Sequence, residues 1–236
     1  MKIQSMRFEN LTFGYSIDRP IFKDITCEIP VNRILMVEGP PGSGQSTLLK
    51  LLAVLHQPNE GSFFVNDKDT SQMSFEEFLP VRRMISYTFD NGGLFANRTL
   101  LDNLTLPLLY HKTCSVDEAE AEAKRFAEEF GFQRQLLERP ASVSGGLRKL
   151  VCTIRSFMQK PEILVMDDPF TGLDTESVKR LIGLIHSRRE QGTLHSLFFT
   201  SRDEHWPKRL GYDSLLIQNG TLELRENHFG SEREAA

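Results

Sequence analysis

Short runs of apolar residues alternate with polar ones in the first third of the chain, a pattern typical of strands. These runs cover Arg7 to Phe13, Ile25 to Ile29 and Ile34 to Glu38. The third run leads into a turn rich in glycine and proline, and Thr47 to Leu55 after it carries apolar residues at helical spacing. The sequence therefore predicts a strand, a glycine turn and a helix in that order.

The middle of the chain changes character near residue 90 and again near residue 160. Ser115 and Glu118 form a capping-box pair ahead of an amphipathic run that ends at Gly131, which predicts a helix. Two short apolar runs, Ile163 to Met166 and His195 to Thr200, are typical of strands buried on both faces. We therefore expect a helical insertion in an α/β core.

The end of the chain predicts a hairpin followed by a tail. Ser214 to Ile217 and Thr221 to Leu224 are joined by Asn219-Gly220, a dipeptide typical of β-hairpins, and 231–236 are expected to be disordered. We expect one domain over 1–236, with an α/β core at 1–89 and 160–225, a helical subdomain at 90–159 and a tail at 226–236.

Composition narrows the function classes. The 236 residues carry a net charge of -4, which gives no electrostatic reason to expect nucleic acid as a partner. We expect a cytoplasmic protein, because no apolar run approaches the ~18 residues of a membrane span and the first residues lack a signal-peptide pattern. The three cysteines lack the spacing of a metal or redox site.

The glycine turn has the spacing of a phosphate-binding loop. It reads Gly39, Pro40, Pro41, Gly42, Ser43, Gly44, Gln45, Ser46 and Thr47. Small residues let backbone amides approach phosphate oxygens, and a hydroxyl such as Ser46 can bind Mg²⁺. The motif has glutamine at the position where lysine is expected, and by itself it also fits an ordinary tight turn.

Three further motifs decide between a phosphate-binding loop and an ordinary tight turn. Residues 142–149 read Ser-Val-Ser-Gly-Gly-Leu-Arg-Lys, 166–169 read Met-Asp-Asp-Pro, and 171–174 read Thr-Gly-Leu-Asp. With the glycine turn, these segments closely resemble the successive motifs of the ABC transporter ATPase family, in family order across nearly the whole chain. The resemblance implies a P-loop NTPase fold of the α/β class: a RecA-like core, an N-terminal antiparallel β subdomain and a helical insertion.

The resemblance also implies roles for individual residues. Tyr15 would stack on adenine, 39–47 would hold phosphates, and Asp167 would bind Mg²⁺ together with Ser46 and Asp90. Ser144, Gly145 and Gly146 would cap the ATP bound by a second subunit, and Asp174 would lie at the dimer seam. The implied ligands are ATP and Mg²⁺, and the implied partners are a second ATPase subunit and an integral membrane permease, which places the protein on the inner face of the membrane.

Four positions depart from the family pattern. Gln45 replaces the lysine, Asp90 stands about where a glutamine belongs, Asp168 replaces the catalytic glutamate, and Ser201 stands for the switch histidine. A lost charge-assisted contact is worth ~1.5–3 kcal/mol and a displaced base costs about 10²-fold in rate. We expect very slow hydrolysis, and four separate changes favour natural decay over an engineered block. His205 is a candidate substitute for the histidine.

The region 91–109 is expected to receive the permease. Gly92 to Phe95, Asp102 to Leu104 and Pro107-Leu108 resemble the Mla-type lipid-trafficking ATPases, and lipoprotein-releasing and macrolide-export cassettes share some of these patterns. Local packing of 93–95 is the alternative reading. Two other functions remain open: an active homodimeric ATPase, and a non-transport regulatory cassette. The substrate, the direction of transport and the identity of the dimer partner do not follow from the sequence.

Overall fold

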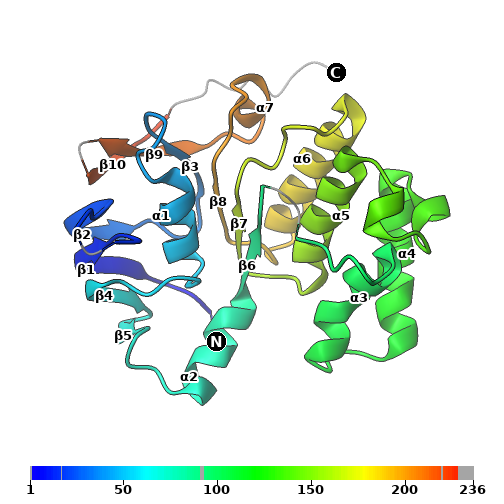
Figure 1. Cartoon of the computed structure of the whole chain (residues 1–236), viewed down its shortest axis with the longest axis horizontal. Coiled ribbons are helices and arrows are strands. Elements are labelled where there is room, and N and C mark those ends of the chain that lie inside the picture. Colours follow the sequence, from blue (N-terminus) through cyan, green and yellow to red (C-terminus); the bar gives the residue numbers. More distant parts are fainter. Residues whose placement is uncertain (1, 17, 91–92, 219, 228–236) are drawn as a thin grey trace.

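The centre of the molecule is a six-stranded sheet in the order β10-β9-β3-β8-β7-β6. The computed structural model describes residues 2–16, 18–90, 93–218 and 220–227. The strands β3 (Ile34–Glu38), β6 (Ile85–Thr88), β7 (Ile163–Met166), β8 (Ser196–Phe199) and β9 (Asp213–Gln218) pair in parallel, and β10 (Thr221–Arg225) pairs antiparallel with β9. All the parallel strands therefore end at the same edge of the sheet. Figure 1 shows this sheet near the middle of the molecule.

The two faces of this sheet belong to two separate hydrophobic cores. Ile34 and Met36 on β3 face one core, whereas Leu35 and Val37 face the other, as alternation along a strand requires. The buried strands β7 and β8 divide their side chains in the same way. Burial on both faces explains why these strands read as continuous apolar runs.

A second, antiparallel sheet covers one face. Its order is β2-β1-β4-β5, formed by β1 (Met6–Phe13), β2 (Phe22–Ile29), β4 (Glu60–Val65) and β5 (Lys68–Asp69). The helix α1 (Gln45–Leu52) buries its leucines between this sheet and the central one. This arrangement is the antiparallel subdomain that the sequence predicted, and it holds the glycine turn against the core.

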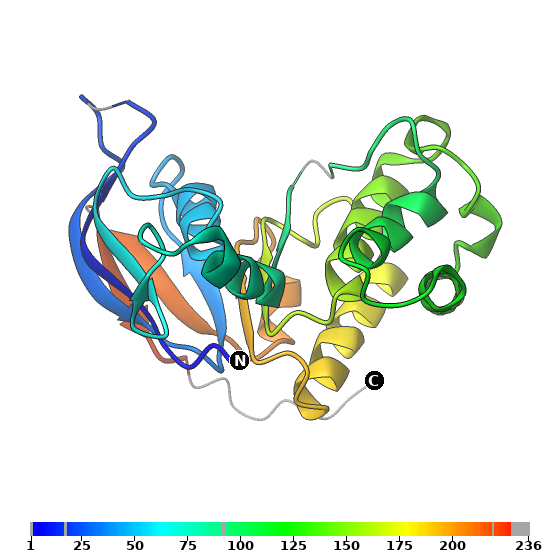
Figure 2. The same cartoon turned by 90° about the horizontal axis from the view of Figure 1, so that it is seen from below.

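Helices cover the other face. Between β6 and β7 the chain forms α3 (Leu100–Tyr110), α4 (Val116–Phe130) and α5 (Gly145–Met158), with short 3-10 turns at Gln133–Gln135 and Pro140–Ser142. The helix α6 (Thr175–Glu190) joins them, and all four lie on the side of the sheet away from α1 (Figures 1 and 2). The helical insertion and the α/β core are thus both present.

Local signals explain where α4 begins and ends. Ser115 and Glu118 form a complete capping box at its start, and Gly131 adopts the left-handed conformation at its end. Its apolar positions bury Ala119, Ala123 and Phe126 against the helical core. The prediction of this helix is confirmed, because capping and periodicity both point to the same boundaries.

Some boundaries and elements differ from the expectation. The helix α1 starts two residues before Thr47 and ends at Leu52, and β2 begins at Phe22. The helix α2 (Phe75–Met84) was not expected: only Val81 is buried and Pro80 lies inside it, so apolar periodicity gives little signal. The terminal hairpin is present as β9 and β10, whereas Asn219 and 231–236 lie outside the described residues.

Candidate nucleotide site

The candidate site lies where the parallel strands end. The glycine turn follows β3, Asp167 and Asp168 follow β7, Ser201 follows β8, and Asp90 follows β6. Ligands of open α/β sheets bind outside the carboxyl ends of the strands, so the topology brings the predicted residues to one place. The short helix α7 (His205–Lys208) follows β8 on the same side.

The glycine turn has the backbone of a phosphate cradle. Gly44 precedes α1 with φ of 100°, and a β-carbon there would lie 2.4 Å from the Ile21 side chain. Gly42 also has positive φ, and a β-carbon on Gly39 would lie 2.5 Å from Ser43 Oγ. Only glycine fits such positions without a shift of the chain. The first amides of α1 and the positive end of its dipole therefore face the turn, as anion binding requires.

Side chains in the turn also fit an anionic ligand. Ser43 Oγ is buried and makes no hydrogen bond to the described residues, so it can donate to a bound oxygen. Ser46 is exposed at the start of α1, and Pro40 and Pro41 are exposed beside it. Gln45 differs, because its Nε2 donates to Gly39 O at 3.2 Å and thereby closes the loop on itself. Glutamine thus stabilises the turn but brings no charge to it.

Tyr15 lies beside this turn. Its ring is 63% exposed, and its hydroxyl is 3.4 Å from Thr47 Oγ1 on α1. Edge-to-face contacts with Phe13 and His56 hold the ring in place. The exposed face of an anchored tyrosine beside a phosphate loop suits an aromatic base, as the sequence predicted.

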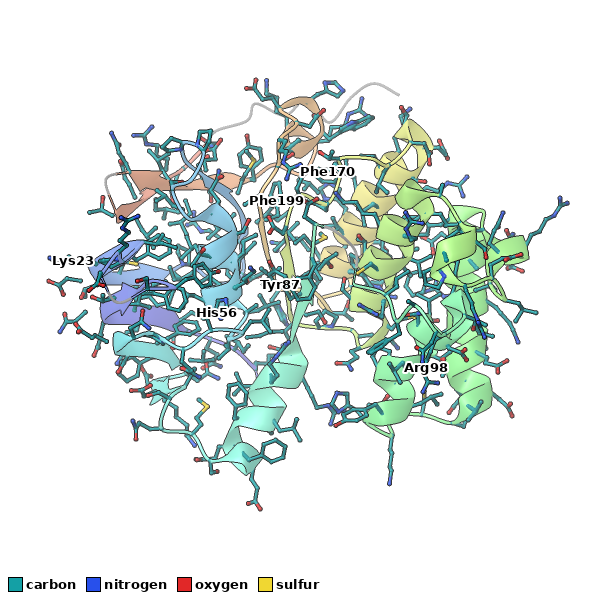
Figure 3. All side chains as sticks on the ribbon, viewed as in Figure 1. Lys23, His56, Tyr87, Arg98, Phe170 and Phe199 are labelled. Atoms are coloured by element: carbon teal, nitrogen blue, oxygen red, sulfur yellow. The ribbon has the colours of Figure 1, made fainter. Side chains whose placement is uncertain are left out.

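Asp167 is held by two hydroxyl groups. Thr200 Oγ1 donates to Asp167 Oδ1 at 2.8 Å, and Tyr87 OH donates to Oδ2 at 3.4 Å. Burial, with the nearby Asp167 carboxylate, raises the pKa of Tyr87, so the phenol stays protonated. Figure 3 shows Tyr87 and His56 toward the middle of the molecule, whereas Arg98 lies among the helices. A carboxylate accepts several hydrogen bonds, so Asp167 keeps lone pairs for a hydrated metal ion.

Asp168 is almost fully buried. Its side chain is 3% exposed, and its Oδ1 accepts from Thr171 Oγ1 at 2.9 Å and from the Arg202 amide at 3.3 Å. Its φ of 48° is unusual for aspartate, and its amide donates to Thr200 Oγ1 at 3.0 Å. Oδ1 is therefore engaged in local contacts, whereas Oδ2 is buried without a hydrogen bond to the described residues. Burial of the whole side chain disfavours a role in activating water.

Two cations hold Asp90. Its Oδ1 accepts from Lys149 Nζ at 3.2 Å, and its Oδ2 accepts from Arg202 Nη2 at 2.9 Å. Arg202 Nε also lies 3.6 Å from Asp168 Oδ2. Lys149 belongs to α5 and Arg202 follows β8, so Asp90 connects the helical part to the core. This arrangement occupies the Asp90 carboxylate, whose role as a magnesium ligand stays a prediction.

Sequence reasoning missed Arg202 and Lys149. It named Ser201 as the residue after β8, but the structure places Ser201 Oγ on the backbone of Asp203 and brings Arg202 to Asp168. His205 is exposed, with its ring packed against Trp206. An available signal was that parallel strands β7 and β8 end side by side, so a cation just after one faces the acids just after the other.

The start of α5 is exposed at Ser144 and Gly145. Ser144 caps α5 by accepting from the Leu147 amide at 3.2 Å. A β-carbon on Gly146 would lie 2.6 Å from Gly172 O, so this helix start packs tightly on the segment before α6. Asp174 caps α6 through Ser177, and these hydrogen bonds hold its pKa below the ordinary value.

Magnesium would need ligands from the nucleotide as well as from the protein. Among the described residues, no three His, Cys, Asp or Glu side chains form a cluster able to hold a metal. One carboxylate and a serine hydroxyl are the usual protein share of a magnesium site in which phosphates complete the shell. Asp167 and Ser46 fit that share.

No helix in the described part of the chain is long and apolar enough to span a membrane.

Comparison with known proteins places these features in a family. A family model described as ABC transporter matches residues 22–171. The sulfate/thiosulfate import protein CysA of Mesorhizobium japonicum is 32% identical over 86% of this chain and 58% of its own length. The ergothioneine transport protein EgtV of Helicobacter pylori is 32% identical over 89% of this chain and 95% of its own length. The chain thus spans less than two thirds of the CysA proteins but nearly all of EgtV.

Solved structures show the same fold. The ATP-binding cassette MJ0796, in a dimer bound to ADP and Pi, superposes with a TM-score of 0.83 at 23% identity, covering 95% of this chain and 99% of that one. An ATP-binding subunit of an ABC transporter gives a TM-score of 0.81 at 22% identity, covering 95% and 90%. The matching segment, the relatives and the fold agree that the chain belongs to the ABC transporter family.

Proposed function

We propose that the chain is an ATP-binding subunit that binds Mg-ATP in the glycine turn, hydrolyses it very slowly and acts on a separate membrane permease. One observation carries the proposal: the backbone of the phosphate cradle is intact, whereas Asp90, Asp168 and Arg202 are engaged with one another. Binding depends mainly on the former and hydrolysis on the latter.

ATP binding is supported by four features of one region. The turn has the glycines and the helix terminus that phosphate needs, Ser43 has a free buried hydroxyl, and Tyr15 offers an exposed ring. Asp167 and Ser46 would contribute ligands to Mg²⁺, whose bound charge offsets that of the phosphates. The family binds ATP, and these residues fit that ligand.

Slow hydrolysis is supported by the state of two side chains. Gln45 is folded onto Gly39 O and carries no charge, and Asp168 is buried on Thr171 and the Arg202 amide. Removing one preorganised donor at a transition state typically costs ~10²- to 10³-fold in rate. Such losses do not multiply when residues act as a unit, so we propose a large reduction without a computed rate.

A dimer is supported by the exposed start of α5. Ser144 and Gly145 are open, and no residue of this chain's own glycine turn bonds to them. A second subunit placed head to tail would bring its nucleotide to this helix start, where exposed amides suit a phosphate. A partner with an intact lysine and glutamate would then hydrolyse ATP even if this chain does not.

A permease is supported by the surface near 93–109. Asn103 is fully buried and bonds the backbone of Phe95 in both directions, and Arg155 Nη2 donates to Gly93 O. The Phe95 ring nevertheless remains 51% exposed on this fixed backbone. The local packing of 93–95 thus leaves the Phe95 ring available, and we propose that this exposed ring receives a permease helix on the inner face of the membrane. Asn91 and Gly92 lie outside the described residues.

The relatives do not agree on a substrate. Their names specify sulfate or thiosulfate import, ergothioneine transport and macrolide export, the last for MacB of Bdellovibrio bacteriovorus at 30% identity over 73% of this chain and 26% of that protein. A lipid substrate, suggested by the resemblance to Mla-type ATPases, stays a prediction.

The boundaries of the helical subdomain at residues 90 and 160 also stay a prediction.

Calorimetric titration with Mg-ATP, followed by recovery of the tagged chain from its own cells, tests the proposal. We expect saturable binding with one nucleotide per chain and recovery of an integral membrane protein. Phe95→Ser should lose the membrane protein and keep ATP binding, with Phe75→Ser on α2 as a matched exposed control. Recovery of no membrane protein in detergent would contradict the transporter function and favour a regulatory cassette. No binding of Mg-ATP would contradict the ATP-binding role itself.

A further inference from the structure

Arg202 lies one strand away from the phosphate turn. It follows β8, which pairs in parallel with β3, and the turn follows β3. Its amide donates to Asp168 Oδ1, so its backbone is fixed at the end of the strands. The inference that follows rests on the proposed binding of ATP in the turn.

The Arg202 guanidinium has donors to spare. It makes one hydrogen bond within the described chain, from Nη2 to Asp90 at 2.9 Å, and its Nε is 3.6 Å from Asp168 Oδ2. A guanidinium carries five N-H donors, and it binds oxyanions such as carboxylate and phosphate through two parallel hydrogen bonds. Its side chain is 69% exposed, so it can change partner without disturbing the core.

The charge balance at this edge calls for a cation. Asp90, Asp167 and Asp168 bring three carboxylates to the strand ends, and a nucleoside triphosphate adds several more negative charges. Gln45 stands in the turn where a cation is expected and carries none. Magnesium offsets part of this charge, and the remainder needs a side chain that reaches the ligand from the core.

Lys149 is less suited to that task. Its side chain is 10% exposed and belongs to α5 in the helical part, where it bonds Asp90. Removing it from Asp90 would leave a buried ammonium without its carboxylate partner, which is strongly destabilising. Moving Arg202 buries no unpaired cation, because its head group is exposed and Asp90 would keep Lys149. The contact that it gives up at Asp168 is a 3.6 Å approach without a hydrogen bond.

We propose that Arg202 supplies the positive charge that the turn lacks: it leaves Asp90 for the terminal phosphate of bound ATP and makes the site prefer ATP to ADP. In the nucleotide-free state Asp90 and Asp168 hold the guanidinium at the strand ends, ready for this exchange. Arg202 is thus a specificity-determining residue of this chain's own site.

Titration of the full chain with Mg-ATP and, separately, Mg-ADP tests the proposal. We expect Arg202→Ala to lower the affinity for ATP about tenfold and the affinity for ADP less than twofold, as loss of one charge-assisted contact implies. Arg202→Lys should keep part of the preference for ATP. Arg225→Ala removes the same charge from the exposed strand β10 and should change neither affinity.

Asp90→Asn provides a second measurement. It replaces the carboxylate that competes for Arg202 with a neutral amide whose oxygen can still accept from Lys149. ATP should therefore bind more tightly, and this gain should vanish in the Asp90→Asn, Arg202→Ala double variant. Weaker ATP binding by Asp90→Asn at saturating Mg²⁺ would contradict the exchange.

The inference and the proposed function fail in different ways. If the natural chain binds ATP but Arg202→Ala keeps the ratio of ATP to ADP affinity, or loses both affinities equally, the assignment of Arg202 is wrong and the function stands. If the natural chain binds no nucleotide, the function is wrong and the role of Arg202 falls with it.

Discussion

The two halves of the candidate site differ in what they use to act on a nucleotide. The glycine turn and α1 use backbone amides, tight glycines and a helix terminus, and these are intact. The strand ends after β6, β7 and β8 use side chains, and there Asp90, Asp168 and Arg202 are paired with one another. Binding that depends on backbone tolerates side-chain change, whereas catalysis depends on the position of individual charged groups.

The largest expected effect comes from a substitution that disrupts the backbone of the glycine turn. Gly44→Ala places a β-carbon 2.4 Å from the Ile21 side chain at φ of 100°, so the turn must shift. We expect ATP affinity to fall about 100-fold, because several amide contacts are lost together. Gly211→Ala has a φ of 62° and open space around it, which makes it a control for backbone strain alone. Equal ATP affinities of the two variants would contradict a backbone cradle.

A smaller effect is expected from the base-binding side. Tyr15→Ala removes the exposed ring beside Thr47 and should weaken ATP about tenfold, the worth of one aromatic stacking contact. Tyr15→Phe keeps the ring and should bind within about twofold of the natural chain. Calorimetric titration distinguishes them, and a large loss in Tyr15→Phe would show that the hydroxyl contact matters more than stacking.

A stability effect is expected where the sequence motif has a structural role. Asp174→Ala removes the cap of α6 and should lower the free energy of unfolding by about 1 kcal/mol. The pKa of Asp174 is lowered in the folded chain, so this contribution is present above its unfolded value near 4 and disappears as the pH falls through the folded value. Urea unfolding at pH 7 and pH 3 checks the sign: the deficit of the variant should shrink at pH 3.

The smallest effect is expected at Tyr87. Its hydroxyl lies 3.4 Å from Asp167 Oδ2, a long hydrogen bond, and Thr200 already holds the other oxygen. Tyr87→Phe should therefore change Mg-ATP affinity less than about twofold, since weak geometry contributes little. Thr200→Val, which removes the shorter bond and the acceptor of the Asp168 amide, should weaken it more. The reverse order would show that the phenol positions the metal ligand.

The fold was accessible from sequence where local rules and burial agree. Ile34 to Val37 alternate between two cores, and Ser115 and Gly131 mark the ends of α4, so pattern and capping predicted these elements. The helix α2 escaped prediction because Val81 is its one buried residue. Ser74 and Glu77 do form a capping box at the start of α2, so a local signal for its start was present, but the helix lacks the apolar face that would have extended the prediction along it.

The site was accessible only in part. Strand order brought the glycine turn, Asp167 and Asp90 to one edge, since each follows a strand end. The pairing of Lys149 and Arg202 with Asp90 depends on packing between α5 and the core, which residue spacing does not give. The rings of Phe170 and Phe199, with centroids 6.2 Å apart, are a second example of a contact that sequence spacing does not give. Figure 3 labels both residues.

Phosphate release measured beside ATP binding tests the central contrast most directly. Three proteins should each be titrated with Mg-ATP and then assayed for phosphate release without a partner subunit. They are the natural chain, the Gln45→Lys, Asp168→Glu double variant and a Gln45→Ala, Asp168→Ala control. We predict that the natural chain binds ATP without measurable release and that the first variant releases phosphate at least about 10²-fold faster. Brisk release by the natural chain would contradict the account and identify it as an active transport ATPase.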